Sequence, residues 1–142
     1  MRRFKFSLEK VLKLRQFKED ECKLSLGQAI SALNKIENDI KQTAQKRHTA
    51  SSQRFQNPGE IAMWNVYILR LEQETERLLK QAVQAQIVVE EKRALYLEAQ
   101  KELKVMENLK DKRHKEYRKE MLNSEMNEVD DITSAKRVTV TP

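Results

Sequence analysis

The 142-residue chain contains only two glycines, two prolines and one cysteine. Gly and Pro form turns and end helices, so their scarcity argues against a rounded domain built from many short elements. The single cysteine, Cys22, excludes an internal disulfide and fits a reduced cytosolic setting. No apolar run approaches the roughly 20 residues that span a bilayer, and the N-terminus lacks the apolar core of a secretory signal peptide.

What the chain does contain is charge and helix-forming residues. Charged residues make up 35% of the chain and aromatic residues only 6%. Leu, Lys, Glu, Gln and Ala are abundant, which is typical of coiled coils and long helices. Apolar residues recur periodically, which argues against disorder. The net charge of +6 predicts an acidic protein surface, nucleic acid or anionic lipid as partner, without choosing among them.

One breaker, "QNPGE" at residues 56–60, divides the sequence. Proline cannot sit inside a helix, but Asn57 can cap one, Pro58 suits the first helical position, and Glu60 completes a capping box. Ser7 is the corresponding cap for the first segment. We therefore predict one domain over residues 1–142: a helix at about 7–55, a turn at 56–60, a helix at about 58–130 and a frayed tail at 132–142.

Both predicted helices carry a heptad seam. In the second, alternate steps of three and four meet an apolar residue at thirteen of seventeen positions: Ile61, Trp64, Ile68, Leu71, Thr75, Leu78, Ala82, Ala85, Val89, Lys92, Tyr96, Ala99, Leu103, Met106, Lys110, Arg113 and Tyr117. The first has a less regular seam: Leu8, Leu12, Arg15, Glu19, Cys22, Leu26, Ala29, Leu33, Ile36 and Ile40. Sustained heptads indicate a coiled coil, and Gly27 inside the pattern costs up to about 1 kcal/mol relative to Ala.

Two facing helices joined by a short loop fold back antiparallel. The predicted fold class is therefore all-α, a long antiparallel two-helix coiled-coil hairpin. Folding about residue 57 places Phe4 near Lys110 and Leu8 near Met106, so both ends of the chain meet.

No catalytic constellation stands out. Both glycines are isolated, so a phosphate-binding loop is absent. His48 and His114 are the only histidines, and no His and Cys cluster has metal-ligand spacing. A thin hairpin also offers no ordinary substrate pocket. We expect no enzymatic activity, no cofactor and no metal.

The basic end formed by residues 1–18 and 110–119 has three competing readings. Glu9, Glu19, Asp20 and Glu21 argue against a transit peptide, because such peptides are poor in acids. A basic coiled-coil nucleic-acid binder is the alternative function, recognisable by affinity that falls steeply with salt. A protein partner is favoured, since apolar residues interrupt the charges all round the helix: Phe4, Phe6, Leu8, Val11, Leu12, Leu14 and Phe17. Some of these residues could instead pack on the second helix.

Three aromatics lie near the predicted tip. Trp64 falls on the seam, so core packing is its expected role, whereas Tyr67 falls off the seam and suits an exposed anchor. Phe55 completes this cluster. A self-associating rod, in which two hairpins form a four-helix assembly, is a further option.

The opening "FKFSLEKVLKLRQFKEDE" resembles the start of the FliJ family, a coiled-coil component of the flagellar type III export apparatus. The matching positions are Phe4, Phe6, Leu8, Val11, Leu12, Arg15, Glu19 and Glu21. The segment after Met106 is similar to the family's second signature. There the matches are Leu109, Lys110, Lys112, Arg113, Glu116, Tyr117, Glu120, Glu128, Asp130, Asp131 and Arg137.

The resemblance implies a hairpin similar to the central stalk of rotary ATPases, without catalysis of its own. It implies that the terminal end inserts into the flagellar export ATPase hexamer, and that the rod links this ring to the large export-gate membrane protein and handles export chaperones. The expected ring contacts are Phe4, Phe6, Leu8, Val11, Leu12, Arg15, Lys110, Arg113 and Tyr117, and the expected gate contacts are Phe55, Trp64 and Tyr67.

The resemblance also implies a cytoplasmic protein peripherally associated with the inner membrane at the flagellar basal body, serving motility. No nucleic acid is expected as partner, and the rod on its own is expected to be monomeric. The stalks of virulence type III secretion systems are similar, so they are an alternative setting.

Overall fold

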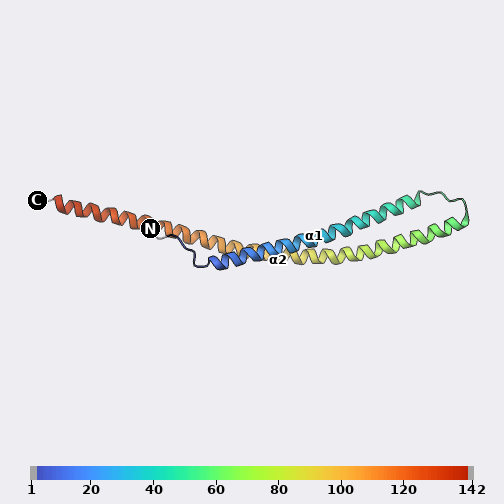
Figure 1. Cartoon of the computed structure of the whole chain (residues 1–142), viewed down its shortest axis with the longest axis horizontal. Coiled ribbons are helices and arrows are strands. Elements are labelled where there is room, and N and C mark those ends of the chain that lie inside the picture. The colour runs from blue at the N-terminus through green and yellow to red at the C-terminus, as the bar shows by residue number, and fades with distance from the viewer. Residues whose placement is uncertain (1–2, 141–142) are drawn as a thin grey trace. The chain divides into compact units, whose positions relative to one another are not determined.

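The computed structural model describes residues 3–140, with side-chain surroundings described over residues 3–136. Over this range the chain forms two helices and no strand: α1, Glu9–Ser51, and α2, Pro58–Val140 (Figure 1). The helices pack against each other in opposite directions, which confirms the predicted all-α hairpin. Neither described helix is long and apolar enough to cross a membrane.

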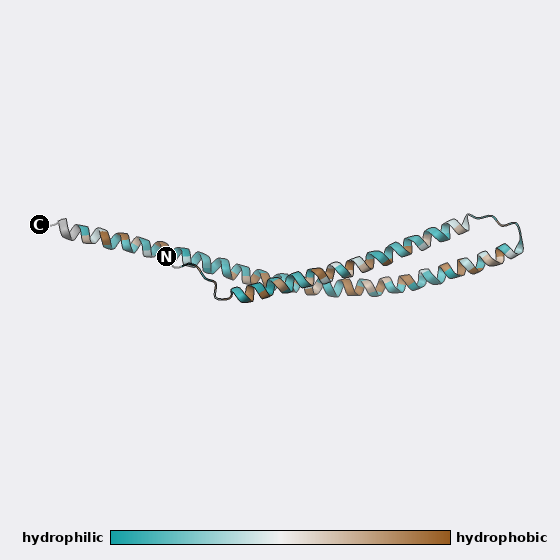
Figure 2. Ribbon diagram, in the orientation of Figure 1, coloured by the Kyte–Doolittle hydropathy of each residue, from teal (hydrophilic) through white to brown (hydrophobic). Residues whose placement is uncertain are grey.

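Close contacts divide the hairpin into two units, and both helices contribute to each. The tip unit is Asp20–Glu98 and includes the connection between the helices. The terminal unit contains the chain up to Glu19 and from Ala99 onward. Figure 2 shows apolar residues recurring along both helices, as the heptad pattern requires.

In the tip unit the predicted seam is the buried face. Ala29, Leu71, Leu78 and Val89 are buried, and most other seam positions are half-buried. The seam also extends past Ile40, where the predicted pattern stops. The added positions are Thr43 and Ala50, both buried.

The buried hydroxyl of Thr43 is satisfied within its own helix. Its Oγ1 donates to the carbonyl of Asp39 at 2.9 Å. Because a buried hydroxyl is costly only without a partner, this threonine can occupy a core position.

In the terminal unit the seam positions Leu12 and Ala99 are buried as well. Arg113 is an exception, because its side chain is exposed although it occupies a seam position. Phe6, which precedes α1, is buried as well.

The start of α2 confirms the predicted cap. Asn57 Oδ1 accepts a hydrogen bond from the backbone N–H of Glu60 at 2.8 Å. The Glu60 carboxylate in turn accepts from the backbone N–H of Gln56 at 3.3 Å, one residue before the position of an ideal capping box. With Pro58 as its first residue, the helix begins where the sequence predicts.

The end of α1 lies at Ser51, earlier than the predicted end near residue 55. The hydroxyls of Ser51 and Ser52 both donate to the carbonyl of His48, at 2.8 and 3.0 Å. The backbone N–H of Gln53 donates to the Ala50 carbonyl, three residues back. These bonds use carbonyls that would otherwise continue the helix, so the helix stops there.

The start of α1 lies at Glu9, two residues later than predicted. The expected cap, Ser7, has another partner: its hydroxyl accepts a hydrogen bond from Arg113 at 2.9 Å. A single turn closed by the Glu9 N–H and the Phe6 carbonyl, at 3.1 Å, precedes the helix.

The predicted fold-back about residue 57 is met at the tip, where the Trp64 indole donates to the Ala50 carbonyl at 2.7 Å. Near the chain start the pairing differs, because Phe4 contacts His114 and Tyr117 instead of the expected Lys110. The residues before Glu9 are not helical. An extended chain advances about 3.3 Å per residue against 1.5 Å in a helix, so Phe4 reaches further along α2.

At its other end α2 continues to Val140, beyond the predicted end near residue 130 and into the predicted frayed tail. No glycine or proline occurs between Gly59 and Pro142 to end it. The side chain of Thr133 bonds the Val129 carbonyl at 2.8 Å within the helix. The side chain of Arg137 and residues 141–142 lie outside what the structure describes.

Gly27 offers a direct test of helix stability in α1. A Cβ built at Gly27 meets no atom within 4 Å. Replacing Gly27 by Ala therefore adds helix propensity without a clash, and we expect the free energy of unfolding to rise by up to about 1 kcal/mol. Chemical denaturation followed by circular dichroism measures the change. The matched control, Ala32→Gly at another exposed position of α1, should lose a similar amount.

Candidate interaction surfaces

An aromatic cluster fixes the chain start to α2 in the terminal unit. The Phe4 ring meets His114 edge-on, with ring centroids 4.8 Å apart, and lies 5.5 Å from Tyr117. All three side chains are half-buried. Phe4 and Tyr117, both predicted as partner contacts, therefore contact each other and hold the N-terminal segment in place.

Arg113 closes this arrangement over Phe6. Its guanidinium lies 5.7 Å from the centre of the Phe6 ring and also donates to Ser7. A cation over an aromatic ring at this distance is attracted by the ring's electrons. Phe6 is only 7% exposed, so both residues act within the hairpin.

Ion pairs join the helices at the edges of the seam. Lys110 pairs with Glu9 at 2.9 Å, and Glu102 accepts from Arg15 at 2.7 Å and from Lys18 at 3.3 Å. All five side chains are partly exposed, so each pair contributes at most about 1 kcal/mol. Arg15 and Lys110, expected to contact a partner, are thus occupied between the helices, where they favour one register.

The outward face of α1 remains uncovered. We define it by Lys10, Val11, Lys13, Leu14 and Phe17, all of them exposed. Leu14 is 65% exposed and Phe17 is 59% exposed. These residues are the apolar surplus that the sequence indicates, and α2 does not cover it.

The nine predicted ring contacts therefore divide into residues that pack within the hairpin and residues that stay exposed. Phe6 and Leu12 are buried, and Leu8 is half-buried against α2. Val11 lies at the edge of the outward face. Leu14 and Phe17, which are not among the predicted contacts, are its most exposed apolar members. Their places on a helical wheel, opposite Leu8 and Leu12, would have identified them.

A groove of about 640 Å³ runs between the N-terminal segment and α2 in the same unit. Its lining is Arg3, Phe4, Lys5, Arg113, Glu116, Tyr117, Glu120, Met121 and Ser124. Arg3, Phe4 and Lys5 of the N-terminal segment therefore share this groove with α2 as far as Ser124.

At the tip, Trp64 has the core role that its seam position predicts. Its indole N–H is bonded to Ala50, and the Phe55 ring packs on it with centroids 5.7 Å apart. Phe55 and Trp64 are both half-buried. This cluster anchors the connection between the helices to the beginning of α2.

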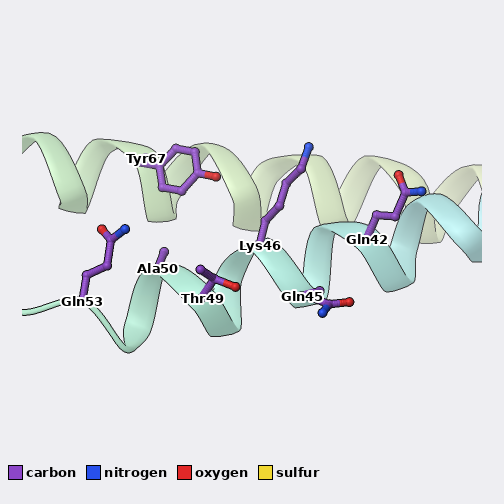
Figure 3. A pocket seen from close by; sticks show the side chains of 7 residues that line it. All are labelled: Gln42, Gln45, Lys46, Thr49, Ala50, Gln53 and Tyr67. Atoms are coloured by element: carbon purple, nitrogen blue, oxygen red, sulfur yellow. The ribbon is translucent and has the colours of Figure 1, made fainter.

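Tyr67 is the exposed aromatic of the tip, at 42% exposure. It lines a pocket of about 350 Å³ with Gln42, Gln45, Lys46, Thr49, Ala50 and Gln53 (Figure 3). In Figure 3 Lys46 extends from α1 across α2, on the side of the hairpin that carries Tyr67. A second hollow of about 570 Å³ joins Tyr67 to Arg54, Phe55, Met63 and Trp64. Tyr67 therefore combines an apolar ring with polar neighbours, as binding anchors do.

Further along α2 in the tip unit, one ion pair shifts the pKa values of its two side chains. A hydrogen bond from Arg77 lowers the pKa of the Glu74 carboxyl below its ordinary value, and the same bond raises the pKa of Arg77. Both groups are exposed, so the pair stays charged at neutral pH without adding appreciable stability.

Over the described residues, no group of three or more His, Cys, Asp or Glu side chains is placed to hold a metal ion. What the described residues do offer is exposed helix faces, to which a partner could bind.

Comparison with protein families gives a match over nearly the whole chain. The family model described as the flagellar FliJ protein matches residues 4–137. Comparison with curated proteins and with solved structures gives no significant match.

Two phenylalanines of the terminal unit form a matched pair for mutation. Phe6→Ala removes a buried ring and the surface beneath Arg113, and we expect the free energy of unfolding to fall by about 3 kcal/mol. Phe17→Ala removes an exposed ring and should change it by less than about 0.5 kcal/mol. Urea denaturation of both variants measures the difference. Equal losses would show that Phe17 also packs inside the protein.

Proposed function

Because this chain belongs to the FliJ family of flagellar proteins, we propose that it is a non-enzymatic stalk and adaptor of the flagellar type III export apparatus. The family match extends over residues 4–137, so it includes both helices and both units. The description of that family names the flagellum, which favours flagellar export over the virulence systems.

The terminal unit is the part that we propose to enter the ring of the export ATPase. The observation that carries this step is the outward face of α1, where Leu14 and Phe17 are exposed beside Lys10 and Lys13. Apolar side chains surrounded by cations suit a protein surface with apolar pockets and acidic rims. A phosphate-tracking helix needs no such apolar face, so a nucleic-acid partner is the weaker alternative.

The tip unit is the part that we propose to contact the export gate. Tyr67 and Met63 are exposed beside two hollows, while Trp64 and Phe55 hold the local backbone in place. A rigid backbone carrying an exposed aromatic side chain loses little conformational freedom on binding. The gate is a membrane protein, so the chain would act at the cytoplasmic side of the inner membrane.

We further propose that export chaperones bind exposed apolar positions along the helices. α2 displays several that α1 leaves uncovered, including Val83, Ile87 and Val105. A helix face of this kind is a common docking surface for other helices. Contact with a chaperone, the ring and the gate would require no catalysis by this chain.

The ring contact can be tested without unfolding the protein. Leu14→Glu combined with Phe17→Glu places two charges on the outward face of α1, and we expect at least about tenfold weaker binding to the export ATPase. Pull-down and stimulation of ATP hydrolysis measure the effect. The control adds the same charge at exposed α1 positions of the tip unit, Gln28→Glu with Ser31→Glu, and should bind normally. Leu8 and Leu12 are unsuitable targets, because charging them would open the seam.

The gate contact has a separate test. Tyr67→Ala with Met63→Glu should weaken binding to the cytoplasmic part of the gate protein by about tenfold or more, while binding to the ATPase stays unchanged. Surface plasmon resonance with each partner measures both affinities. If the variant lost both partners equally, the two ends would not have separate roles.

A further inference from the structure

Residues near the end of α2 carry an apolar stripe that stays exposed within the described part of the chain. We call residues 120–136 the overhang. Leu122, Met126, Val129 and Ile132 are each more than half exposed. Their spacing of four, three and three residues places them on one side of the helix. An exposed stripe of this length indicates a contact with another helix.

The charge of the overhang restricts what that helix can be. Residues 120–131 contain Glu120, Glu125, Glu128, Asp130 and Asp131 and no basic residue. Two overhangs packed on each other would bring these like charges together, which is unfavourable. The fitting partner is therefore a basic helix with its own exposed apolar face.

The chain itself carries such a helix face. The outward face of α1 displays Val11, Leu14 and Phe17 beside Lys10 and Lys13, so it is opposite in charge to the overhang and similar in apolar length. Both surfaces belong to the terminal unit, but α2 is one continuous helix there, so its overhang cannot turn back onto α1 of the same chain.

We propose that two copies of this chain pair through their terminal units, with the overhang of each copy lying on the outward face of α1 of the other. A twofold axis makes the contact reciprocal, so the complementary surfaces are used twice. The family resemblance implies a monomeric rod, and a self-associating rod is the other option that the sequence leaves open. The helical overhang with its exposed stripe is the feature that changes this expectation.

The proposed pairing is weak because each contact is small. Each contact involves only three or four apolar side chains from either helix, which places it at or below the roughly 1,200 Å² expected for a stable interface. We therefore expect reversible association in the micromolar range. Because it covers the outward face of α1, a paired chain cannot use that face for another partner.

A charge-swap experiment on the full chain tests the proposal by sedimentation equilibrium. Lys10→Glu with Lys13→Glu makes both surfaces of one variant acidic. In a second variant, Glu125→Lys, Glu128→Lys and Asp130→Lys together change the charge of residues 120–131 from −5 to +1, so both of its surfaces are basic. Each variant alone should associate at least about tenfold more weakly than the original chain. Their equimolar mixture restores opposite charges at both contacts, so it should form a heterodimer about as strong as the original dimer.

A matched pair of variants locates the contact on the overhang. Met126→Lys with Val129→Lys should weaken association about tenfold or more, whereas Asn123→Lys with Asn127→Lys adds the same charge away from the stripe and should change it less than about threefold. Circular dichroism verifies that all variants remain helical.

The proposal is overturned if the original chain is monomeric throughout the micromolar range, if the charge-swap mixture stays monomeric, or if the stripe variant associates normally. No ATPase or gate protein enters these measurements. A monomeric chain would therefore leave the proposed export function intact, and failed ATPase binding would leave the pairing intact.

Discussion

The seam between α1 and α2 is the interaction on which the rest of the structure depends. Each helix packs against one other helix, so only a narrow stripe of side chains is buried from water. Leu78 and Val89 belong to this stripe. Over residues 3–140 there is no second layer of structure to support it. Packing of this stripe must therefore hold two long helices together, and every side chain beyond it faces solvent or a partner. Exposed apolar residues on the outer faces are consequently informative in this molecule.

Polar contacts refine what the seam provides. The pairs of Glu9 with Lys110 and of Glu102 with Arg15 contribute little energy individually, but a helix slid by one turn would break them. The Asn57 cap and the packing of Phe55 on Trp64 determine where the chain reverses. Together they select one register from several that an apolar stripe alone would permit.

Much of this fold could be predicted from sequence because its signals are local or periodic. The heptad spacing identifies Leu71 and Ala99 as core, and "NPGE" identifies the start of α2. The end of α1 was harder, since Ser51 and Ser52 stop the helix through side-chain bonds that carry no strong sequence signal. The site was predicted as a region and not residue by residue. Distinguishing buried Phe6 from exposed Phe17 requires knowing which way each ring points, and Phe6 precedes the helix whose period would have indicated it.

The indole of Trp64 has one more consequence. It is the only tryptophan in the chain, and it is tethered to the Ala50 carbonyl while packed on Phe55. Tryptophan emission from this protein therefore originates from the place where the chain reverses. Trp64 is therefore an intrinsic fluorescence probe of the tip. Opening of the tip would shift the wavelength of its emission maximum, whereas a conformational change elsewhere would do so only if the helices transmit it to the tip.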